Sequence, residues 1–172
     1  PEYVVVEKEE ATIQIPAEKV LLSVGRKAVM NKLGLENLSI EISRGGIPTN
    51  EYLQTNRPHV YACGDVNGKS LLAHTAVREG AVAVNHVLGI DDRMSYDAIP
   101  GVVYTNPEIA GVGRTEEELT DKGESYEVVK LPMAFSGRFV AENELGNGLC
   151  KMIVDDNKQI IGCHILGNPA SE

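Results

Sequence analysis

The chain has 172 residues, of which 42% are hydrophobic, so it is long enough to build a core in one domain or in two small ones. Its 25 acidic and 16 basic side chains give a formal net charge of -9, which argues against non-specific nucleic-acid binding because that binding depends on clustered Lys and Arg. No apolar run approaches the roughly 20 residues of a membrane-spanning helix, so we expect no membrane span.

The three cysteines, Cys63, Cys150 and Cys163, are widely spaced and include no C-x-x-C pair. This usage is typical of reduced thiols in a cytoplasmic protein. Burial as a small hydrophobic side chain is favoured over a catalytic role for each of them. We therefore expect a cytoplasmic location and no catalytic cysteine in this chain.

The first third of the chain contains short strand-like runs. Residues 3–7 and 11–15 are rich in β-formers around a charged turn, which predicts a hairpin. The apolar run at 20–24, closed by Gly25 and Arg26, predicts a buried strand that ends in a tight turn. Residues 27–57 are mixed, with turn residues at 44–46.

The middle of the chain predicts a strand followed by a long helix. Residues 59–63 suit a buried strand and run directly into Gly64 and Asp65. Apolar residues then recur at helical spacing from about 71 to 88, and Gly89 stands where the residue after a helix is often glycine.

The last seventy residues change character. Strands are predicted at 102–104, 109–112, 127–131, 149–154 and 159–166, the last two joined as a hairpin. Thr115 and Glu118 have the spacing of a capping box and predict a helix to about Lys122. One helix with an antiparallel set of strands predicts an α+β unit that is separate from the first half.

Asp65 is the residue that most strongly suggests a ligand. In an open α/β sheet, ligands bind beyond the carboxyl ends of the strands, and Gly64 lets the backbone turn and approach a ligand closely. A carboxylate accepts hydrogen bonds from hydroxyls, and the start of the next helix favours negative charge. A polyol joined to a ring that gains negative charge on reduction, such as a flavin nucleotide, suits both features. The alternative, about equal in weight on spacing alone, is that Asp65 only caps a turn.

A resemblance covers nearly the whole chain in the right order. The segment TNRPHVYACGD at 55–65 resembles the second flavin-binding motif of the FAD-dependent pyridine nucleotide–disulfide oxidoreductases. Upstream, 20–26 is similar to the strand and Gly-Arg turn where that family's NAD domain rejoins its FAD domain. Downstream, 100–116, 151–153 and 161–167 are similar to parts of its interface domain. Within the family, 72–76 with Glu79 and Gly80 resembles the dihydrolipoamide dehydrogenase branch most.

The resemblance implies roles for particular residues. Asp65 would accept hydrogen bonds from the ribityl chain of FAD, next to Gly64. The helix start would present N–H groups to the flavin pyrimidine oxygen, and Gly25 would make a backbone contact to NAD. The residues of that helix start are Leu71, Leu72, Ala73 and His74. Each has a simpler alternative, since Gly25 suits a turn and the His74 side chain need not touch a ligand. For His59, His86 and His164 the structural interpretation is favoured, because none has a metal-ligand or triad neighbour at useful spacing.

Several motifs of the resembling family do not occur here. There is no pair of cysteines four residues apart, no G-x-G-x-x-G fingerprint and no His-Pro…Glu acid–base element. We therefore expect a C-terminal fragment, inactive alone, of a longer enzyme, with no catalytic residue and no metal ligand. The expected domains are the end of an NAD-binding domain at 1–26, the last part of an FAD-binding domain at 27–97, and a truncated interface domain at 98–172. The predicted fold class is thus α/β followed by α+β with an antiparallel sheet.

The resemblance implies electron transfer between NAD(H) and dihydrolipoamide through FAD and a redox disulfide, in a homodimer joined through 98–172. Lipoyl-bearing 2-oxo acid dehydrogenase complexes or glycine cleavage components would be partners. Two alternatives remain at this point: a sister disulfide reductase of the glutathione or mercuric reductase kind, and a non-catalytic binding or assembly module.

Overall fold

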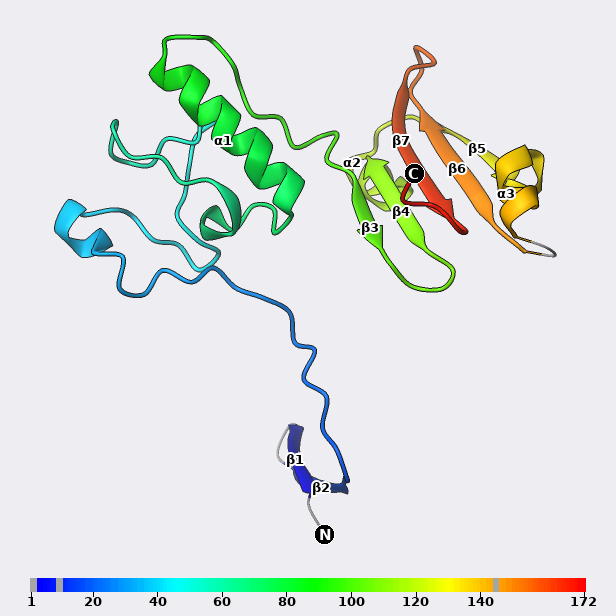
Figure 1. Cartoon of the computed structure of the whole chain (residues 1–172), viewed down its shortest axis with the longest axis horizontal. Coiled ribbons are helices and arrows are strands. Elements are labelled where there is room, and N and C mark those ends of the chain that lie inside the picture. Colours follow the sequence, from blue (N-terminus) through cyan, green and yellow to red (C-terminus); the bar gives the residue numbers. More distant parts are fainter. Residues whose placement is uncertain (1–2, 9–10, 144–145) are drawn as a thin grey trace.

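The structure, a computed structural model, describes residues 3–8, 11–143 and 146–172. The predicted N-terminal hairpin is confirmed: β1 (Tyr3–Lys8) pairs antiparallel with β2 (Ala11–Pro16). The turn between these strands lies outside the described residues. Figure 1 shows this hairpin apart from the other elements, joined to them by an extended segment.

The buried strand predicted at 20–24 is wrong. These residues form no strand, and Leu21 and Val24 are each 90% exposed. An apolar strand of this kind is buried when neighbouring strands and covering helices enclose it on both faces. The described residues supply no such neighbours for this segment.

The prediction of a regular strand at 59–63 is also wrong. The segment is extended, but its pairing is limited to one bridge between Gln54 and Tyr61. Two backbone bonds make this bridge: Ala62 N–H donates to the Leu53 carbonyl at 3.0 Å, and Thr55 N–H donates to the Val60 carbonyl at 2.9 Å. The local sequence thus gives an extended chain, while a full strand needs partners that the described residues do not include.

The middle of the chain packs on one long helix. The short 3-10 helices η1 (Leu35–Leu38) and η2 (Gly64–Asn67) precede α1 (Ala73–Val87). Helix α1 ends as predicted, with Gly89 at a φ of +77°. Its inner face, with Val82 and Ala83, packs against Leu53 and Met94. A second small core joins Ile40, Ile47 and Ala62.

The C-terminal part is a five-stranded antiparallel sheet in the order β3-β4-β7-β6-β5. The strands agree closely with the predicted runs: β3 (Gly101–Val103), β4 (Ile109–Gly113), β5 (Glu127–Pro132), β6 (Leu149–Val154) and β7 (Ile160–Leu166). The predicted α/β plus α+β fold class with an antiparallel sheet is therefore confirmed.

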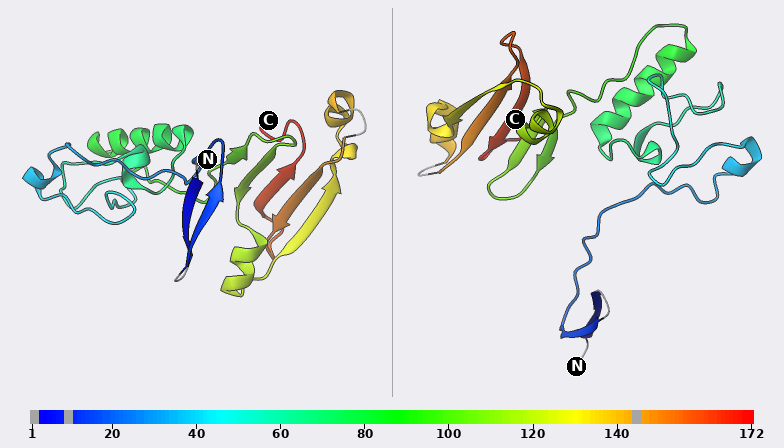
Figure 2. Two further views of the ribbon diagram at one scale, coloured as in Figure 1. Left: turned by 90° about the horizontal axis from the view of Figure 1, so that it is seen from below. Right: turned by 180° about the vertical axis from the view of Figure 1, so that it is seen from behind.

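Helix α2 (Glu116–Lys122) carries the predicted capping box. Thr115 Oγ1 accepts from Glu118 N–H at 3.2 Å, and the Glu118 carboxylate accepts from Thr115 N–H at 3.0 Å. Figure 2 shows α2 on one face of the sheet and the C-terminal residues on the other. Helix α3 (Gly137–Glu142) and the short η3 (Met133–Phe135) were not predicted; Phe139 of α3 is buried. No helix among the described residues is long and apolar enough to cross a membrane.

Candidate functional site

The candidate site is the loop that carries Asp65 and the adjoining start of α1. Gly64 is buried, begins η2 and has a φ of +78°, a conformation that favours glycine. A Cβ at this position would lie 3.2 Å from the Ala76 Cβ on α1. Glycine therefore lets the loop turn while lying against the helix, and the next residue, Asp65, is exposed.

A buried carboxylate, Glu79, holds this loop to the helix. Glu79 is 0% exposed, and its Oε2 accepts from Gly64 N–H at 2.5 Å and from Asn67 Nδ2 at 2.9 Å. Its Oε1 accepts from the Tyr96 hydroxyl at 2.6 Å. Burying a carboxylate is costly unless such donors surround it, so these three bonds fix the position of the loop relative to α1.

The surroundings of Glu79 change the acidity of two neighbours. The pKa of the Tyr96 hydroxyl is raised, first by burial and then by its hydrogen bond to Glu79. The pKa of the Cys63 thiol is also raised, mainly by burial and further by the charge of Glu79. Both groups thus keep their protons at neutral pH, so Tyr96 remains a donor and Cys63 is a poor nucleophile.

A second glycine-containing segment, residues 45–47, supports the loop that carries Asp65. Ile47 N–H donates to the Val66 carbonyl at 2.9 Å. A Cβ on Gly46 would lie 2.6 Å from the Val66 oxygen, and one on Gly68 would lie 2.0 Å from the Gly45 oxygen. The two backbone segments approach closely enough that only glycine fits, which makes the Asp65 loop a rigid support.

The start of α1 offers unpaired N–H groups near this loop. The cap residue Leu72 is extended and makes no side-chain cap bond, and the first helical bond of the main chain is from Ala76 N–H to the Leu72 carbonyl at 3.0 Å. The N–H groups of the first turn, from Ala73 onward, therefore lack intrahelical acceptors. Leu71 is 41% exposed, so this end of the helix is open to a ligand.

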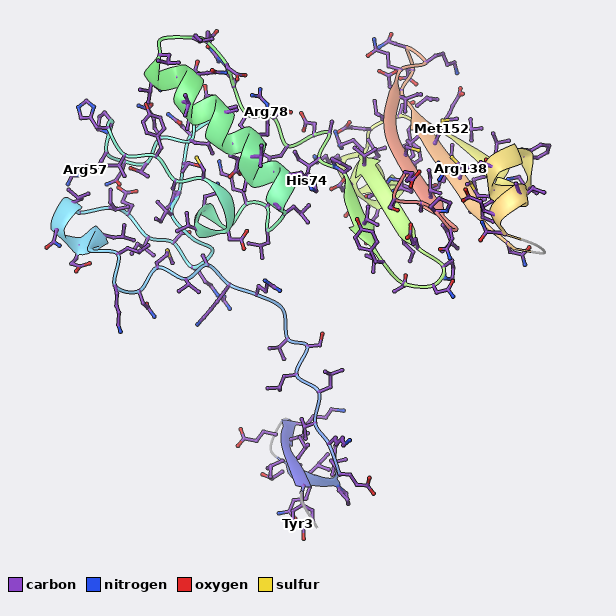
Figure 3. All side chains as sticks on the ribbon, viewed as in Figure 1. Tyr3, Arg57, His74, Arg78, Arg138 and Met152 are labelled. Atoms are coloured by element: carbon purple, nitrogen blue, oxygen red, sulfur yellow. The ribbon has the colours of Figure 1, made fainter. Side chains whose placement is uncertain are left out.

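His74 lies at the same end of α1, where Figure 3 shows it facing the chain that leads to β3. Its Nε2 is 2.8 Å from the Pro100 carbonyl oxygen. The side chain thus connects the helix start to the connection before the sheet, while its main chain stays in the first helical turn.

No direct contact joins Gly25 to the other predicted site residues. It has a φ of +84°, as a turn glycine would, but nothing lies within 4 Å of a Cβ built there. Its predicted contact to NAD stays a prediction. Two of the other histidines have structural neighbours: His86 Nδ1 is 2.8 Å from the Tyr61 hydroxyl, and His164 Nε2 is 3.0 Å from the Arg114 carbonyl oxygen.

The sequence reasoning missed the anchoring role of Glu79 and the close approach of Gly46 and Gly68. For Glu79 a signal was present, because Thr75, Glu79 and Val82 share the buried face of α1 at helical spacing. A carboxylate on such a face predicts a buried hydrogen-bond acceptor. For the glycines no local signal exists, since the close contact joins segments about twenty residues apart.

The arrangement can hold a ligand rather than transform one. An exposed carboxylate accepts bonds from hydroxyls, and free helix N–H groups donate to a carbonyl or anionic oxygen. Among the described residues no group of three or more His, Cys, Asp or Glu side chains could hold a metal ion. The site therefore provides orientation for a polar, oxygen-rich molecule.

Comparison with known proteins adds family information. Two family models match: "Pyridine nucleotide-disulphide oxidoreductase" over residues 2–80, and the dimerisation domain of the same family over residues 99–172. The chain is 38% identical over 163 residues to dihydrolipoyl dehydrogenase from Bacillus subtilis, covering 94% of this chain and 34% of the relative. It is 39% identical over 160 residues to the human mitochondrial dihydrolipoyl dehydrogenase, covering 92% of this chain and 31% of the relative.

Solved structures give the same picture. LpdA from Mycobacterium tuberculosis superposes with a TM-score of 0.83 at 26% identity, covering 94% of this chain and 35% of that chain. The flavoprotein disulfide reductase RclA from Escherichia coli superposes with a TM-score of 0.76 at 26% identity, covering 98% of this chain and 39% of that chain. The chain thus spans about a third of the length of the curated relatives it matches.

Proposed function

The chain belongs to the pyridine nucleotide–disulphide oxidoreductase family, and from this premise we propose that it supplies a flavin-contacting edge and a dimer-forming region to an FAD-dependent dihydrolipoyl dehydrogenase. We divide it into the end of an NAD-binding domain at 1–26, the last part of an FAD-binding domain at 27–97 and an interface domain at 98–172. The names of the relatives support the reaction, and the family description of residues 99–172 supports the homodimer.

The observation that carries the proposal is the Glu79 anchor. It holds the loop that carries the exposed residue Asp65 against α1, the helix whose first-turn N–H groups are open. These are the two kinds of group that a flavin nucleotide needs along one edge: an acceptor for its ribityl hydroxyls and donors for its pyrimidine oxygen.

The residues present fit FAD along that edge. Asp65 would accept from the ribityl hydroxyls, Gly64 would allow close approach, and the N–H groups of residues 71–74 would donate to the pyrimidine oxygen. When bound, FAD supplies the two-electron step between a dithiol–disulfide couple and NAD. Glu79 keeps the loop and helix aligned for this contact, and no cysteine pair four residues apart occurs in this chain to serve as the redox disulfide.

The proposed substrates are dihydrolipoamide and NAD, and the proposed partners are lipoyl-bearing 2-oxo acid dehydrogenase or glycine cleavage components. A second candidate is a related flavoprotein disulfide reductase, which the similarity to RclA favours. The full-length protein that carries this chain separates the two in an assay of dihydrolipoamide with NAD against glutathione disulfide with NADPH. Turnover of only the second pair would reject the dehydrogenase assignment. The cytoplasmic location rests on the cysteine usage and stays a prediction.

The flavin contact is tested by Asp65→Ala in that full-length protein. Loss of hydrogen bonds to a charged acceptor is worth about 1.5–3 kcal/mol, which is roughly ten- to hundredfold in FAD affinity. The holoenzyme should also lose thermal stability, because a bound cofactor stabilises the folded state. Asp121→Ala, at an exposed position on α2, is the matched control. Equal dissociation constants for FAD in the wild type and Asp65→Ala would leave Asp65 as a turn residue and remove the flavin contact.

A further inference from the structure

Three sulfur atoms lie on one face of the C-terminal sheet. In the register of β6 and β7, Met152 is opposite Cys163, and Cys150 is opposite Ile165. Residues that face each other across two strands point to the same side, as do residues two apart in one strand. Cys150, Met152 and Cys163 therefore share a face, and Figure 3 shows Met152 on β6 among the sheet side chains.

This face is opposite to the one that α2 covers. Lys151, between the two sulfur residues of β6, donates from Nζ to the Glu116 carboxylate on α2 at 2.9 Å. Alternation along the strand then sends Cys150 and Met152 to the other side, where Figure 2 shows the C-terminal residues. The three sulfur residues thus lie on the face opposite α2, where Cys163 shares a cavity with the C-terminal residues Ala170 and Ser171.

The spacing favours a bridging ion over a disulfide. Directly opposite residues such as Met152 and Cys163 have Cβ atoms about 4.5–5.5 Å apart, whereas the diagonal pair Cys150–Cys163 has Cα atoms about 7–8 Å apart and Cβ atoms somewhat closer. A disulfide needs Cα atoms within about 4.4–6.8 Å, so the diagonal pair does not close without backbone movement. An ion between two thiolates adds two metal–sulfur bonds of about 2.3 Å each, which spans the larger separation.

The surroundings favour a soft ion. Cys163 lines a cavity of about 210 Å³ whose walls include the apolar side chains of Val112, Ile165 and Ala170. All three sulfur residues are half-buried.

We propose that Cys150 and Cys163, with Met152 as a third donor, bind one Cu(I) ion on this face of the sheet. Thiolate sulfur suits both Cu(I) and zinc, but zinc takes Cys, His and carboxylate ligands, so the Met152 thioether favours Cu(I). On binding, two S–H bonds break and three Cu–S bonds form, two to thiolates and one to the Met152 thioether; the two protons pass to solvent, and the oxidation state of copper does not change. The site lies apart from the Asp65 loop and does not depend on the proposed flavin function.

The first test is an anaerobic titration of the 172-residue chain with Cu(I) in competition with bicinchoninate. The wild type should take one equivalent. Cys150→Ser and Cys163→Ser should each weaken binding by more than about tenfold, since even outer-shell partners of a metal are worth about 10- to 100-fold in affinity. Met152→Leu should have a smaller effect in the same direction. Cys63→Ser is the matched control and should bind as the wild type does.

A second measurement uses the wild type alone and so does not depend on the folding of a variant. One bound Cu(I) should release two protons and protect Cys150 and Cys163, but not Cys63, from iodoacetamide, as mapped by peptide mass spectrometry. Retained binding in the double variant Cys150→Ser/Cys163→Ser, or protection of neither cysteine of the pair, would overturn the proposal. Failure to compete with bicinchoninate would overturn it as well.

Discussion

The backbone N–H of Gly64 donates to the carboxylate of Glu79 across 2.5 Å, in the interior of the protein. This bond joins the residue before Asp65 to the middle of helix α1. Asp65, the exposed residue proposed to contact a ligand, is thus held in place by the buried side chain of Glu79.

Glu79→Gln should destabilise the fold. The amide keeps the size of the side chain but replaces one acceptor oxygen with a donor, which leaves Gly64 N–H or Tyr96 without its acceptor. An unsatisfied buried donor costs about 1–3 kcal/mol, to be measured by urea unfolding. Glu117→Gln, at an exposed position of α2, is the control and should change the free energy of unfolding by less than about 0.5 kcal/mol. Equal unfolding curves for both variants would contradict the anchoring role.

Two glycine substitutions should change the free energy of unfolding in opposite directions. Gly68→Ala places a Cβ 2.0 Å from the Gly45 oxygen at a φ of +72°, so it should destabilise the protein by at least about 1–3 kcal/mol. Gly80→Ala lies inside α1, where nothing is within 4 Å of the new Cβ, and should stabilise it by about 0.5–1 kcal/mol.

Both free energies can be read from denaturant unfolding of the same preparation. A stabilising Gly68→Ala would show that the two backbone segments are not in contact. A destabilising Gly80→Ala would show that the surface of α1 at that point is covered.

The carboxyl group of Asp92 should have an unusually low pKa. Arg78 donates to both of its carboxylate oxygens, at 2.6 and 2.7 Å, and Asn85 donates at 2.8 Å. These bonds, with Arg78 the largest cause, lower the pKa of Asp92 from 3.8 to about 2. A lowered folded-state pKa stabilises the protein above pH 3.8, and this stabilisation disappears as the pH falls to 2.

Arg78→Met should therefore raise the pKa of Asp92 toward 3.8, measured by NMR titration of the carboxyl carbon. The variant should also lose less of its stability than the wild type between pH 4 and pH 2. Asp91 is an internal control, because its lowered pKa has Tyr52 as its first cause and Arg93 as its second. An unchanged Asp92 titration in the variant would show that the ion pair does not form in solution.

Elements with local signals were predictable from the sequence. The capping box of Thr115 and Glu118 gave the start of α2, and Gly89 gave the end of α1. In both cases the determining contacts lie within four residues, so the pattern alone carries the information. The alternating strands of the C-terminal sheet were found for the same reason, although their order was not.

Elements that need distant partners were not predictable. Residues 20–24 have the composition of a buried strand but are exposed, because composition does not supply neighbouring strands. Ser136 does begin α3, accepting from Phe139 N–H at 3.4 Å, yet a helix of six residues leaves too short a periodic pattern to detect. At the candidate site, Asp65 was found from its place after an apolar run, whereas the Glu79 bonds depend on the tertiary fold.

The position of β7 in the sheet has a consequence for how this part of the protein is assembled. Strand β7 lies between β4 and β6, although it is the last of the five to leave the ribosome. Until it is present, β3–β4 and β5–β6 are two separate antiparallel strand pairs, and an isolated pair of strands is marginally stable in water. The sheet is therefore completed in a single late step, in which β7 closes a long chain loop to reach β4, and such non-local pairing is slow. During synthesis the two strand pairs have open edges, which exposes this half of the chain to misassociation until β7 is added.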